Sequence, residues 1–175
     1  MNKKLKLSEL KRMSIEDFKS SEKDNIVVLL DDVRSLNNIG SVFRTCDAMA
    51  VKKLYLCGIT ATPPHREIRK TAIGASESVK WEYQKNPVNV LEKYVKLGYD
   101  IIAVEQTSKA IALDKFKLSN KKILLIFGNE VSGVHQDLID FSNFSVEIPQ
   151  WGTKHSLNIS VSVGIILWSI KMQMA

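Results

Sequence analysis

The sequence predicts an α/β fold in which helices flank a mostly parallel β-sheet. Short, continuous apolar runs of strand length recur along the chain, and segments of helical length lie between several of them. Strands that alternate with helices are typical of parallel sheets, because parallel neighbours need a long crossover connection. With 175 residues and no internal repeat, the chain has the length of one domain that can bury its own core.

The expected strands are apolar runs, as in strands that are buried on both faces of a sheet. They span residues 26–30, 53–57, 99–104, 123–127 and 144–148. The expected helices span residues 39–50, 66–75, 88–97 and 157–172.

Polar residues mark the expected starts of two of these helices. Asn38 is the expected N-cap of the first helix, and Thr153 or Ser156 is the expected cap of the last one, after Pro149 has ended the preceding strand. The residues of the first helix that we expect to pack inward are Ile39, Phe43, Cys46 and Ala50.

The polar and basic segment 1–25 is expected to form an N-terminal helical arm. It carries two helix-start signals, one at Ser8 and one at Ser14, which precedes Asp17 in the spacing of a capping box. We expect this arm to dock on the domain or on a ligand, and the domain itself to span residues 26–175.

Composition and charge narrow the function classes. The formal net charge is +6 and the isoelectric point is near 9.3, which favours nucleic acid or an anionic membrane surface as partner. No secretory signal is visible, and the most apolar stretch, residues 159–172, is too short and too interrupted to span a bilayer. We therefore expect no membrane function.

Cysteine and histidine usage points to a reducing compartment without a metal site. The cysteines Cys46 and Cys57 form neither a disulfide framework nor a metal-ligand spacing, so the cytoplasm is the expected location. His65, His135 and His155 lie far apart in the sequence, without partners at ligand spacing, and no metal is expected.

Ligands of parallel sheets bind beyond the carboxyl ends of the strands, so the loops after the strands are the places to search for a site. The loop and helix after the first strand contain Arg44. Taken alone, this arginine is better explained as a surface residue paired with Asp47, because such i,i+3 pairs are common on helices.

Two further loops carry unusual residues. Gly128 and Gly133 follow a buried strand, as where backbone turns sharply or lies against a ligand, although a plain turn is the alternative. The segment lacks the Lys-Ser/Thr of a P-loop, and no G-x-G-x-x-G is present. After the last strand, His155 adjoins Ser156 without the elbow motif of a serine hydrolase. Trp151 either stacks on a base or adenine or, as is commoner for tryptophan, is buried or lies at an interface.

Taken in order, the three loops resemble one known family. They read N-x-G-x-x-x-R-T-x-D-A, F-G-N-E-x-x-G and I-P-x-x-G-x-x-x-S-L-N-x-S-V. This combination resembles the SpoU/TrmH family of RNA ribose 2′-O-methyltransferases, within the SPOUT superfamily. The resemblance covers residues 26–170, nearly the whole domain.

The resemblance implies an α/β fold whose C-terminal part forms a deep trefoil knot, a homodimer with the active site near the subunit interface, and S-adenosylmethionine as cofactor. The cofactor-binding positions that it implies are Gly128, Ile148 and Leu157, with Glu105 and Gln106 as a weaker addition. The catalytic positions that it implies are Asn38, Arg44, Glu130, Ser156 and Asn158.

These residue types suit methyl transfer to a ribose hydroxyl. The oxygen gains negative character as its proton leaves, so a fixed cation stabilises the transition state more than the ground state. Arg44 fits that role as an electrostatic anchor, because a guanidinium with a pKa above about 12 does not readily act as a base. Glu130 is expected to orient Arg44 or to accept a hydrogen bond from the substrate, while the remaining polar residues fix the loop geometry.

A basic face is the expected contact with RNA. Arg66, Arg69 and Lys70 are spaced to lie on one face of a helix, and Lys154 lies in the third loop. Further cations that extend this patch are Lys3, Lys4, Lys6, Lys11, Arg12, Lys52 and Lys53. A merely solvated helix face is the alternative for each of them alone.

Two departures from the family pattern concern the cofactor rim or the dimer seam. Ala50 stands where many relatives have glycine, and Gln150-Trp151 follows Ile-Pro where methionine is usual.

The leading hypothesis is a methyltransferase acting on tRNA or rRNA. The alternatives are a non-catalytic RNA-binding relative of the same fold and, with less support, a small enzyme acting on a free nucleotide.

Overall fold

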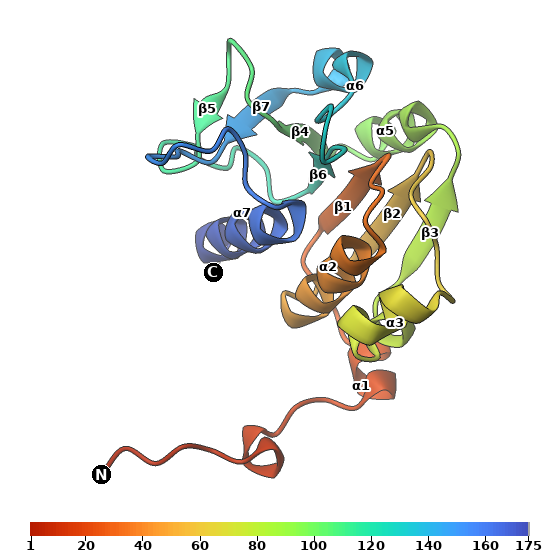
Figure 1. The fold of residues 1–175 in the computed structure, drawn as a ribbon, viewed down its shortest axis with the longest axis vertical. Helices are drawn as coiled ribbons and strands as arrows, with labels where there is room; N and C mark the ends of the chain where they lie inside the picture. The colour runs from red at the N-terminus through yellow and green to blue at the C-terminus, as the bar shows by residue number, and fades with distance from the viewer. Residues whose placement is uncertain (175) are drawn as a thin grey trace.

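The computed structural model describes residues 1–174 and contains a seven-stranded parallel sheet with helices on both faces (Figure 1). The strands are β1 (Ile26–Asp31), β2 (Lys53–Cys57), β3 (Trp81–Gln84), β4 (Asp100–Val104), β5 (Ile111–Ala112), β6 (Ile123–Phe127) and β7 (Phe144–Glu147). The helices are α1 (Ile15–Ser20), α2 (Leu36–Ala48), α3 (Arg66–Ala72), α4 (Ala75–Ser78), α5 (Pro87–Lys96), α6 (Gln136–Phe141) and α7 (Ile159–Met174), after a 3₁₀ turn at Leu7–Leu10. Ala175, the last residue of the predicted domain, lies outside the described residues.

The strand order places the carboxyl ends of strands that are far apart in the sequence next to one another. The order is β3-β2-β1-β6-β4-β7-β5, and every pairing is parallel. Phe127, at the end of β6, pairs with Leu30 on one side and with Val104 on the other. The loops that follow β1, β4, β6 and β7 therefore leave the sheet side by side. The predicted α/β class with a parallel sheet is confirmed, and the trefoil knot stays a prediction.

Strand β1 lies at the centre of the fold because its side chains enter both cores. Ile26, Val28 and Leu30 pack in the core that α2 and α7 cover, and Val27 and Leu29 in the core that α5 and α6 cover. Every residue of β1 is buried. An unbroken apolar run is therefore required here, as the sequence indicated.

The start of α2 differs from the prediction. Ser35 is the N-cap, and its Oγ accepts a hydrogen bond from the Asn38 backbone N–H at 3.3 Å. Asn38 is not the cap; it lies inside the helix, which frees its amide side chain for the site described below. Ile39, Phe43 and Cys46 are buried as expected.

The last helix also begins on a residue other than those predicted. Helix α7 starts at Ile159, and the Asn158 side-chain oxygen accepts a hydrogen bond from the Ser160 N–H at 2.9 Å. The predicted caps Thr153 and Ser156 are wrong, because they lie in the loop before the helix.

Several elements were not predicted from the sequence. Strands β3 and β5 lie at or near the edges of the sheet and are only partly buried, so they lack a continuous apolar run. Helix α6 has Leu138 as its one buried residue. The predicted helix at 66–75 is two helices, because the backbone turns left-handed at Ile73 and Gly74, with φ of 48° and 85°.

The N-terminal arm has one confirmed signal and one wrong one. Ser14 caps α1 by accepting a hydrogen bond from the Asp17 N–H at 3.1 Å, and α1 packs against α4. The 3₁₀ turn at Leu7–Leu10 begins before Ser8, with Lys6 at its N-cap. Figure 1 shows the first residues extending away from the sheet. Within residues 1–174, no helix combines the length and apolar character needed to cross a bilayer.

Helices α2 and α5 end in the same hydrogen-bond pattern with different residues. After α2, the Ala50 and Val51 N–H groups donate to Asp47 and Cys46 carbonyls. After α5, Gly98 and Tyr99 make the equivalent bonds. This Schellman arrangement requires a left-handed residue, with φ of 49° at Ala50 and 75° at Gly98. Ala50, a residue with a Cβ in this left-handed conformation, is therefore strained.

We predict that Ala50→Gly raises the free energy of unfolding by about 1 kcal/mol, because glycine adopts this conformation without a Cβ clash. Gly98→Ala, where nothing lies within 4 Å of the new Cβ, should lower it by about the same amount. Urea denaturation followed by circular dichroism measures both changes. A loss of stability in Ala50→Gly would contradict the strain.

Candidate active site

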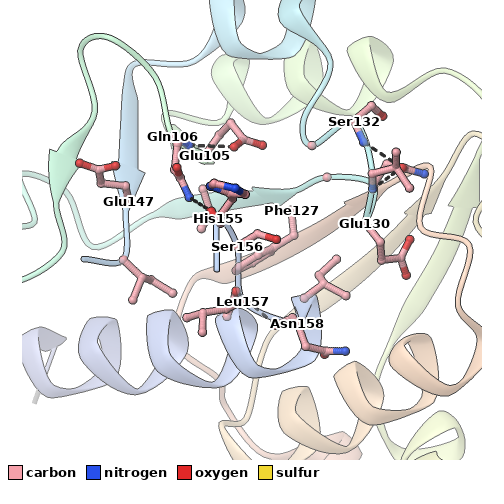
Figure 2. A pocket seen from close by; sticks show the side chains of 18 of the residues that line it. Glu105, Gln106, Phe127, Glu130, Ser132, Glu147, His155, Ser156, Leu157 and Asn158 are labelled. Carbon is pink, nitrogen blue, oxygen red and sulfur yellow. Dashed lines mark hydrogen bonds between the residues drawn. The ribbon is translucent and has the colours of Figure 1, made fainter. Parts of the chain in front are cut away.

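A cavity of about 460 Å³ lies at the carboxyl ends of β4, β6 and β7, against the first turn of α7 (Figure 2). Its walls come from the loops after these strands, as expected for a parallel sheet. The lining residues include Glu105, Gln106, Phe127, Gly128, Glu130, Ser132, Glu147, Ile148, Gln150, His155, Ser156, Leu157, Asn158 and Ile159. All five predicted cofactor-binding residues are among them.

The glycines after β6 are required by close backbone contact. A Cβ at Gly128 would lie 2.1 Å from the Gly133 carbonyl carbon and the Val134 nitrogen. The loop closes on itself, since Asn129 and Gly133 exchange two backbone hydrogen bonds of 2.9 Å. The Asn129 side-chain oxygen accepts two more, from the Val131 and Ser132 N–H groups. The segment is therefore a compact, rigid turn in the cavity wall.

Glu105 and Gln106 join the β4 loop to the loops on either side (Figure 2). The Glu105 carboxylate accepts hydrogen bonds from the Val134 N–H at 2.9 Å and the Gln106 N–H at 2.8 Å. The Gln106 side-chain amide donates to the His155 carbonyl at 2.7 Å. Gly133 must be glycine because a Cβ there would lie 2.2 Å from a Glu105 oxygen.

The Glu130 carboxylate binds the start of α2. It accepts hydrogen bonds from the Arg34 N–H at 3.0 Å, the Ser35 N–H at 3.1 Å and the Asn38 side-chain amide at 3.1 Å. Burial by itself raises the pKa of the Glu130 carboxyl, but these hydrogen bonds outweigh it and hold the pKa below its ordinary value. Glu130 is therefore ionised at neutral pH.

Asn38 carries this connection to the third loop. Its side-chain oxygen accepts a hydrogen bond from the Asn158 amide at 3.1 Å, and the Asn158 oxygen accepts from Ser160. Glu130, Asn38 and Asn158 thus form one hydrogen-bonded chain across three loops that are far apart in the sequence. These three predicted catalytic residues lie together. Glu130, Asn158 and Ser156 line the cavity, and Asn38 lies behind them, outside its lining.

Arg44 is the predicted catalytic residue that the single chain neither brings to the cavity nor joins to the other four. It is exposed on α2 and lies outside the cavity lining. In the described part of the chain, no hydrogen bond or ion pair joins it to Glu130 or to Asp47. Asp47 accepts a hydrogen bond from the Ser78 hydroxyl instead, so the predicted Arg44–Asp47 pair is wrong.

The predicted RNA-binding cations are exposed but lie in two places. Arg66, Arg69 and Lys70 lie on α3, and Lys154 lies in the loop before α7. None of them lines the cavity. Trp151, in the same loop as Lys154, is 93% exposed in the single chain, so it is not a buried core residue.

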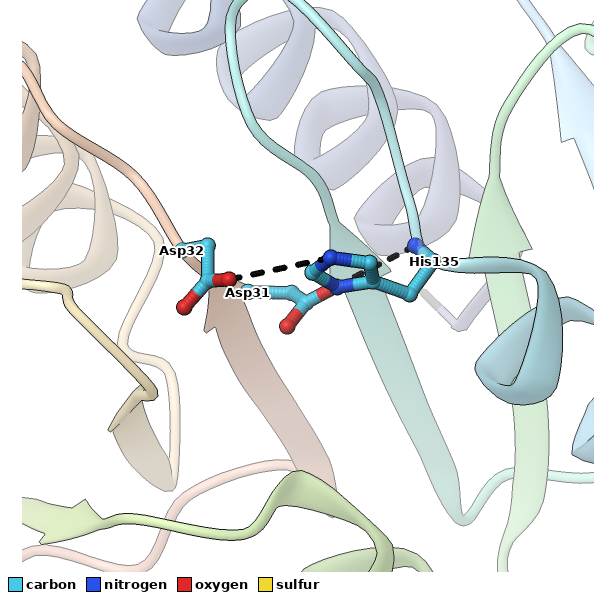
Figure 3. A group of neighbouring side chains, drawn as sticks. All are labelled: Asp31, Asp32 and His135. Carbon is cyan, nitrogen blue, oxygen red and sulfur yellow. Dashed lines mark hydrogen bonds and ion pairs between the residues drawn. The ribbon is translucent and has the colours of Figure 1, made fainter.

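One group near the site was missed by sequence reasoning. Asp31, Asp32 and His135 lie together beside the β6 loop (Figure 3), although 104 residues separate Asp31 from His135. The His135 N–H donates to an Asp31 carboxylate oxygen at 3.2 Å, and the Nδ1 atom lies 2.8 Å from the same oxygen. Because Asp31 and His135 bond directly, the group is an ion pair that anchors the end of the β6 loop. Only the tertiary contact reveals it.

The titration of this pair follows from its burial. Asp31 is 1% exposed, and burial raises the pKa of its carboxyl despite the hydrogen bonds from His135. The hydrogen bond to Asp31 raises the pKa of the His135 imidazole. The His135 imidazole therefore keeps its second proton to a higher pH than a free histidine does.

Comparison with known proteins identifies the family. The family model described as "SpoU rRNA Methylase family" matches residues 25–168. This chain belongs to the SpoU rRNA methylase family. The family and the RNA methyltransferase class predicted from the three loops are confirmed.

Individual relatives agree in sequence. A protein of Aquifex aeolicus named tRNA (guanosine(18)-2′-O)-methyltransferase is 31% identical over 170 residues, which cover 94% of this chain and 76% of that protein. An "uncharacterized tRNA/rRNA methyltransferase" of Borreliella burgdorferi is 32% identical over 160 residues, covering 91% of this chain and 69% of the relative.

Solved structures agree in fold. The Aquifex aeolicus TrmH/SpoU tRNA modifying enzyme superposes with a TM-score of 0.80 and 26% identity, over 91% of this chain and 80% of that one. AviRb from Streptomyces viridochromogenes, solved with AdoMet, has a TM-score of 0.79 at 22% identity, over 90% of this chain and 64% of that one. The second likeness concerns the fold alone.

We predict that His135→Gln lowers the free energy of unfolding most at acidic pH. Because the folded pKa of His135 lies above the unfolded value near 6.5, its stabilisation is fully present below about pH 6.5. This stabilisation is lost as the pH rises through the folded pKa.

Urea denaturation at four pH values between about 5.5 and 8.5 measures this difference between wild type and variant. His65→Gln, at the N-cap of α3, is the matched control substitution. A difference that grows with pH would contradict the assignment.

Proposed function

We propose that this protein transfers a methyl group from S-adenosylmethionine to a ribose 2′-hydroxyl of tRNA or rRNA. The single observation that carries the proposal is the hydrogen-bonded chain Glu130–Asn38–Asn158, which joins the start of α2 to two loops that line the cavity. The names of the relatives support an RNA substrate, and those of several support tRNA.

The charge of the cavity fits the cofactor. Glu105, Glu130 and Glu147 line it, and among its described lining residues there is no lysine or arginine. S-adenosylmethionine carries a positive sulfonium and a positive ammonium group, which such a wall attracts. The volume also lies within the range of small-molecule sites, about 300–1,000 Å³.

Backbone groups of the closed β6 loop and of the segment at Ile148 and Leu157 would hold the cofactor, as predicted. Bound there, the cofactor supplies an activated methyl group. The protein's own part is to position the ribose and to stabilise the negative charge that develops on its 2′-oxygen. We assign the charge stabilisation to Arg44 and the positioning to Asn38, Glu130, Ser156 and Asn158.

Arg44 requires a second copy of the chain. Helix α7 buries one side against the sheet, yet its other side exposes the apolar residues Val161, Ile165, Trp168 and Met172 at helical spacing. Trp168 is 57% exposed. A helix that is apolar on all sides is normally covered, so we propose a homodimer packed on α7.

The dimer would complete the active site. Ile159 and Ser162, at the start of α7, line the cavity, and α2, which carries Arg44, packs against α7. A subunit seated on α7 therefore lies beside both. Arg44 is exposed and unpaired in the single chain, so we propose that it serves an active site shared between the two subunits. We also propose that the reaction uses no metal. The location that we propose is the cytoplasm, in keeping with the two free, buried cysteines.

We predict that the protein, incubated with labelled S-adenosylmethionine and total RNA, produces alkali-resistant dinucleotides. A 2′-O-methyl group blocks the hydroxyl that alkaline cleavage requires. Mapping 2′-O-methyl sites in RNA from cells with and without the protein names the nucleotide. If the cofactor binds in calorimetry but no tRNA or rRNA is methylated, the non-catalytic RNA-binding alternative replaces this proposal.

Arg44→Ala should lower kcat by about 100-fold or more, the usual effect of removing a donor that stabilises transition-state charge. The cofactor dissociation constant should stay nearly unchanged, because Arg44 lies outside the cavity lining. Lys96→Ala, on the opposite face, serves as the control. Retained turnover in Arg44→Ala would overturn the assigned role.

Trp168→Glu should convert the dimer to a monomer and abolish methyl transfer, because a charge in an apolar seam remains desolvated and unpaired. Val95→Glu, which changes an equally exposed apolar residue on α5, should leave both properties unchanged. Light scattering after size exclusion measures the mass. A wild-type monomer that methylates RNA would refute the shared site.

A further inference from the structure

A second cavity lies at the amino ends of β1, β2 and β3, at the other end of the parallel strands from the active-site cavity. Its volume is about 470 Å³, and it lies between α1 and the segments that lead into these strands. Its lining residues are Lys19, Ser21, Glu22, Lys23, Asn25, Lys52, Ser78, Val79 and Lys80. We call this cavity the basic cleft.

The charge of the basic cleft is the reverse of that of the active-site cavity. Four of its lining residues are lysines, and Glu22 is the single carboxylate. Such a concave group of ammonium charges raises the local concentration of anions. Within residues 1–174, Lys19 and Lys80 form no ion pair.

The other two lysines are held in place by neutral groups. The Lys52 Nζ donates to the Asn25 side-chain oxygen at 2.6 Å. The Lys23 Nζ donates to the backbone carbonyls of Phe18 and Ser21. These contacts orient the ammonium groups without neutralising them, so their charge remains available to a ligand.

Two nearby carboxylates are paired elsewhere, Asp24 with Lys171 and Glu82 with Lys53. Asp47 lies against the cleft, because it accepts a hydrogen bond from the hydroxyl of Ser78, a lining residue whose neutral group does not balance the carboxylate. Asp47 and Glu22 therefore oppose four lysines, and positive charge remains in excess in the basic cleft.

The basic cleft lies near the other cationic surfaces. Helix α4 packs against both α1 and α3, so the cleft adjoins the helix that carries Arg66, Arg69 and Lys70. The exposed segment that leads into α1 adds Lys11 and Arg12. The cations of α3 and the basic cleft are therefore separated by one short helix, α4, which carries Glu77.

We propose that the basic cleft binds backbone phosphates of the RNA substrate, away from the ribose that is methylated. This inference rests on the proposed function. The active-site cavity lies at the carboxyl ends of the strands and the cleft at their amino ends. These strands are about 20 Å long, so one nucleotide cannot occupy both sites. At about 3.4 Å of rise per phosphate, roughly six nucleotides of one strand span that length.

The chemistry favours phosphate over base recognition. No aromatic side chain is among the described residues that line the cleft, so it offers ammonium donors without a stacking platform. The cleft therefore adds affinity and register to RNA binding, while the active site selects the nucleotide.

The test compares the double variant Lys19→Gln/Lys80→Gln with the control Lys96→Gln/Lys115→Gln, which removes two exposed lysines elsewhere. Binding of tRNA is measured between about 50 and 200 mM salt, with methyl transfer alongside. For the cleft variant we expect the slope of log K against log salt to become shallower by about one to two, and KM for RNA to rise several-fold. The cofactor dissociation constant and kcat at saturating RNA should not change.

Equal salt slopes in the cleft and control variants would overturn the proposal. So would a loss of binding to phosphatidylserine vesicles with RNA binding unchanged, because that result assigns the cleft to a membrane surface. The test stays separate from that of the proposed function: a wild type that binds tRNA but transfers no methyl group refutes the activity, and the salt slopes still decide the cleft.

Discussion

The Glu130 carboxylate is the group on which the arrangement of the active site depends. It accepts hydrogen bonds from two backbone N–H groups before α2 and from the Asn38 side chain. Charge-assisted bonds of this kind are about twice as strong as neutral ones. Because Asn38 in turn binds Asn158, one carboxylate fixes the relative positions of three loops. The loops hold their shape before any ligand binds, which lowers the entropic cost of reaching a reactive geometry.

The β6 loop that carries Glu130 is itself fixed at both ends. Its first residues close on Asn129 and Gly133, its end is bound by Glu105, and His135 pairs with the buried Asp31. Each contact uses a residue from a neighbouring strand end. The parallel order β1-β6-β4 is therefore what makes the site possible, because it brings these strand ends to one edge.

The carboxyl and amino ends of the parallel strands differ in charge, and this difference matches the charges of the cofactor and of the RNA. Carboxylates line the cavity at the carboxyl edge, and lysines line the cleft at the amino edge. A single pocket cannot be both negative for a cationic cofactor and positive for a polyanionic substrate. Separate edges let each ligand meet the opposite charge, with the ribose as the point where they approach one another.

Local sequence predicted the central strands, the main helices and the glycine turn after β6, because burial on both faces demands unbroken apolar runs and close backbone contact demands glycine. It missed the edge strands and α6, which bury too little to leave a pattern. It also misplaced the caps of α2 and α7. Several nearby polar residues can cap a helix, and the choice depends on which side chain a distant loop engages. Asn38 illustrates this, since its bonds to Glu130 and Asn158 arise only in the folded chain.

The sequence by itself determined the fold class, the family and the set of polar residues at the strand ends, because these are encoded in short segments. Tertiary structure alone decided which of those residues meet. It joined Glu130, Asn38 and Asn158, paired Asp31 with His135, and left Arg44 exposed beside α7. The reason is physical: contacts between residues about 100 positions apart depend on strand order, and strand order is set by how whole elements pack rather than by any local run of residues.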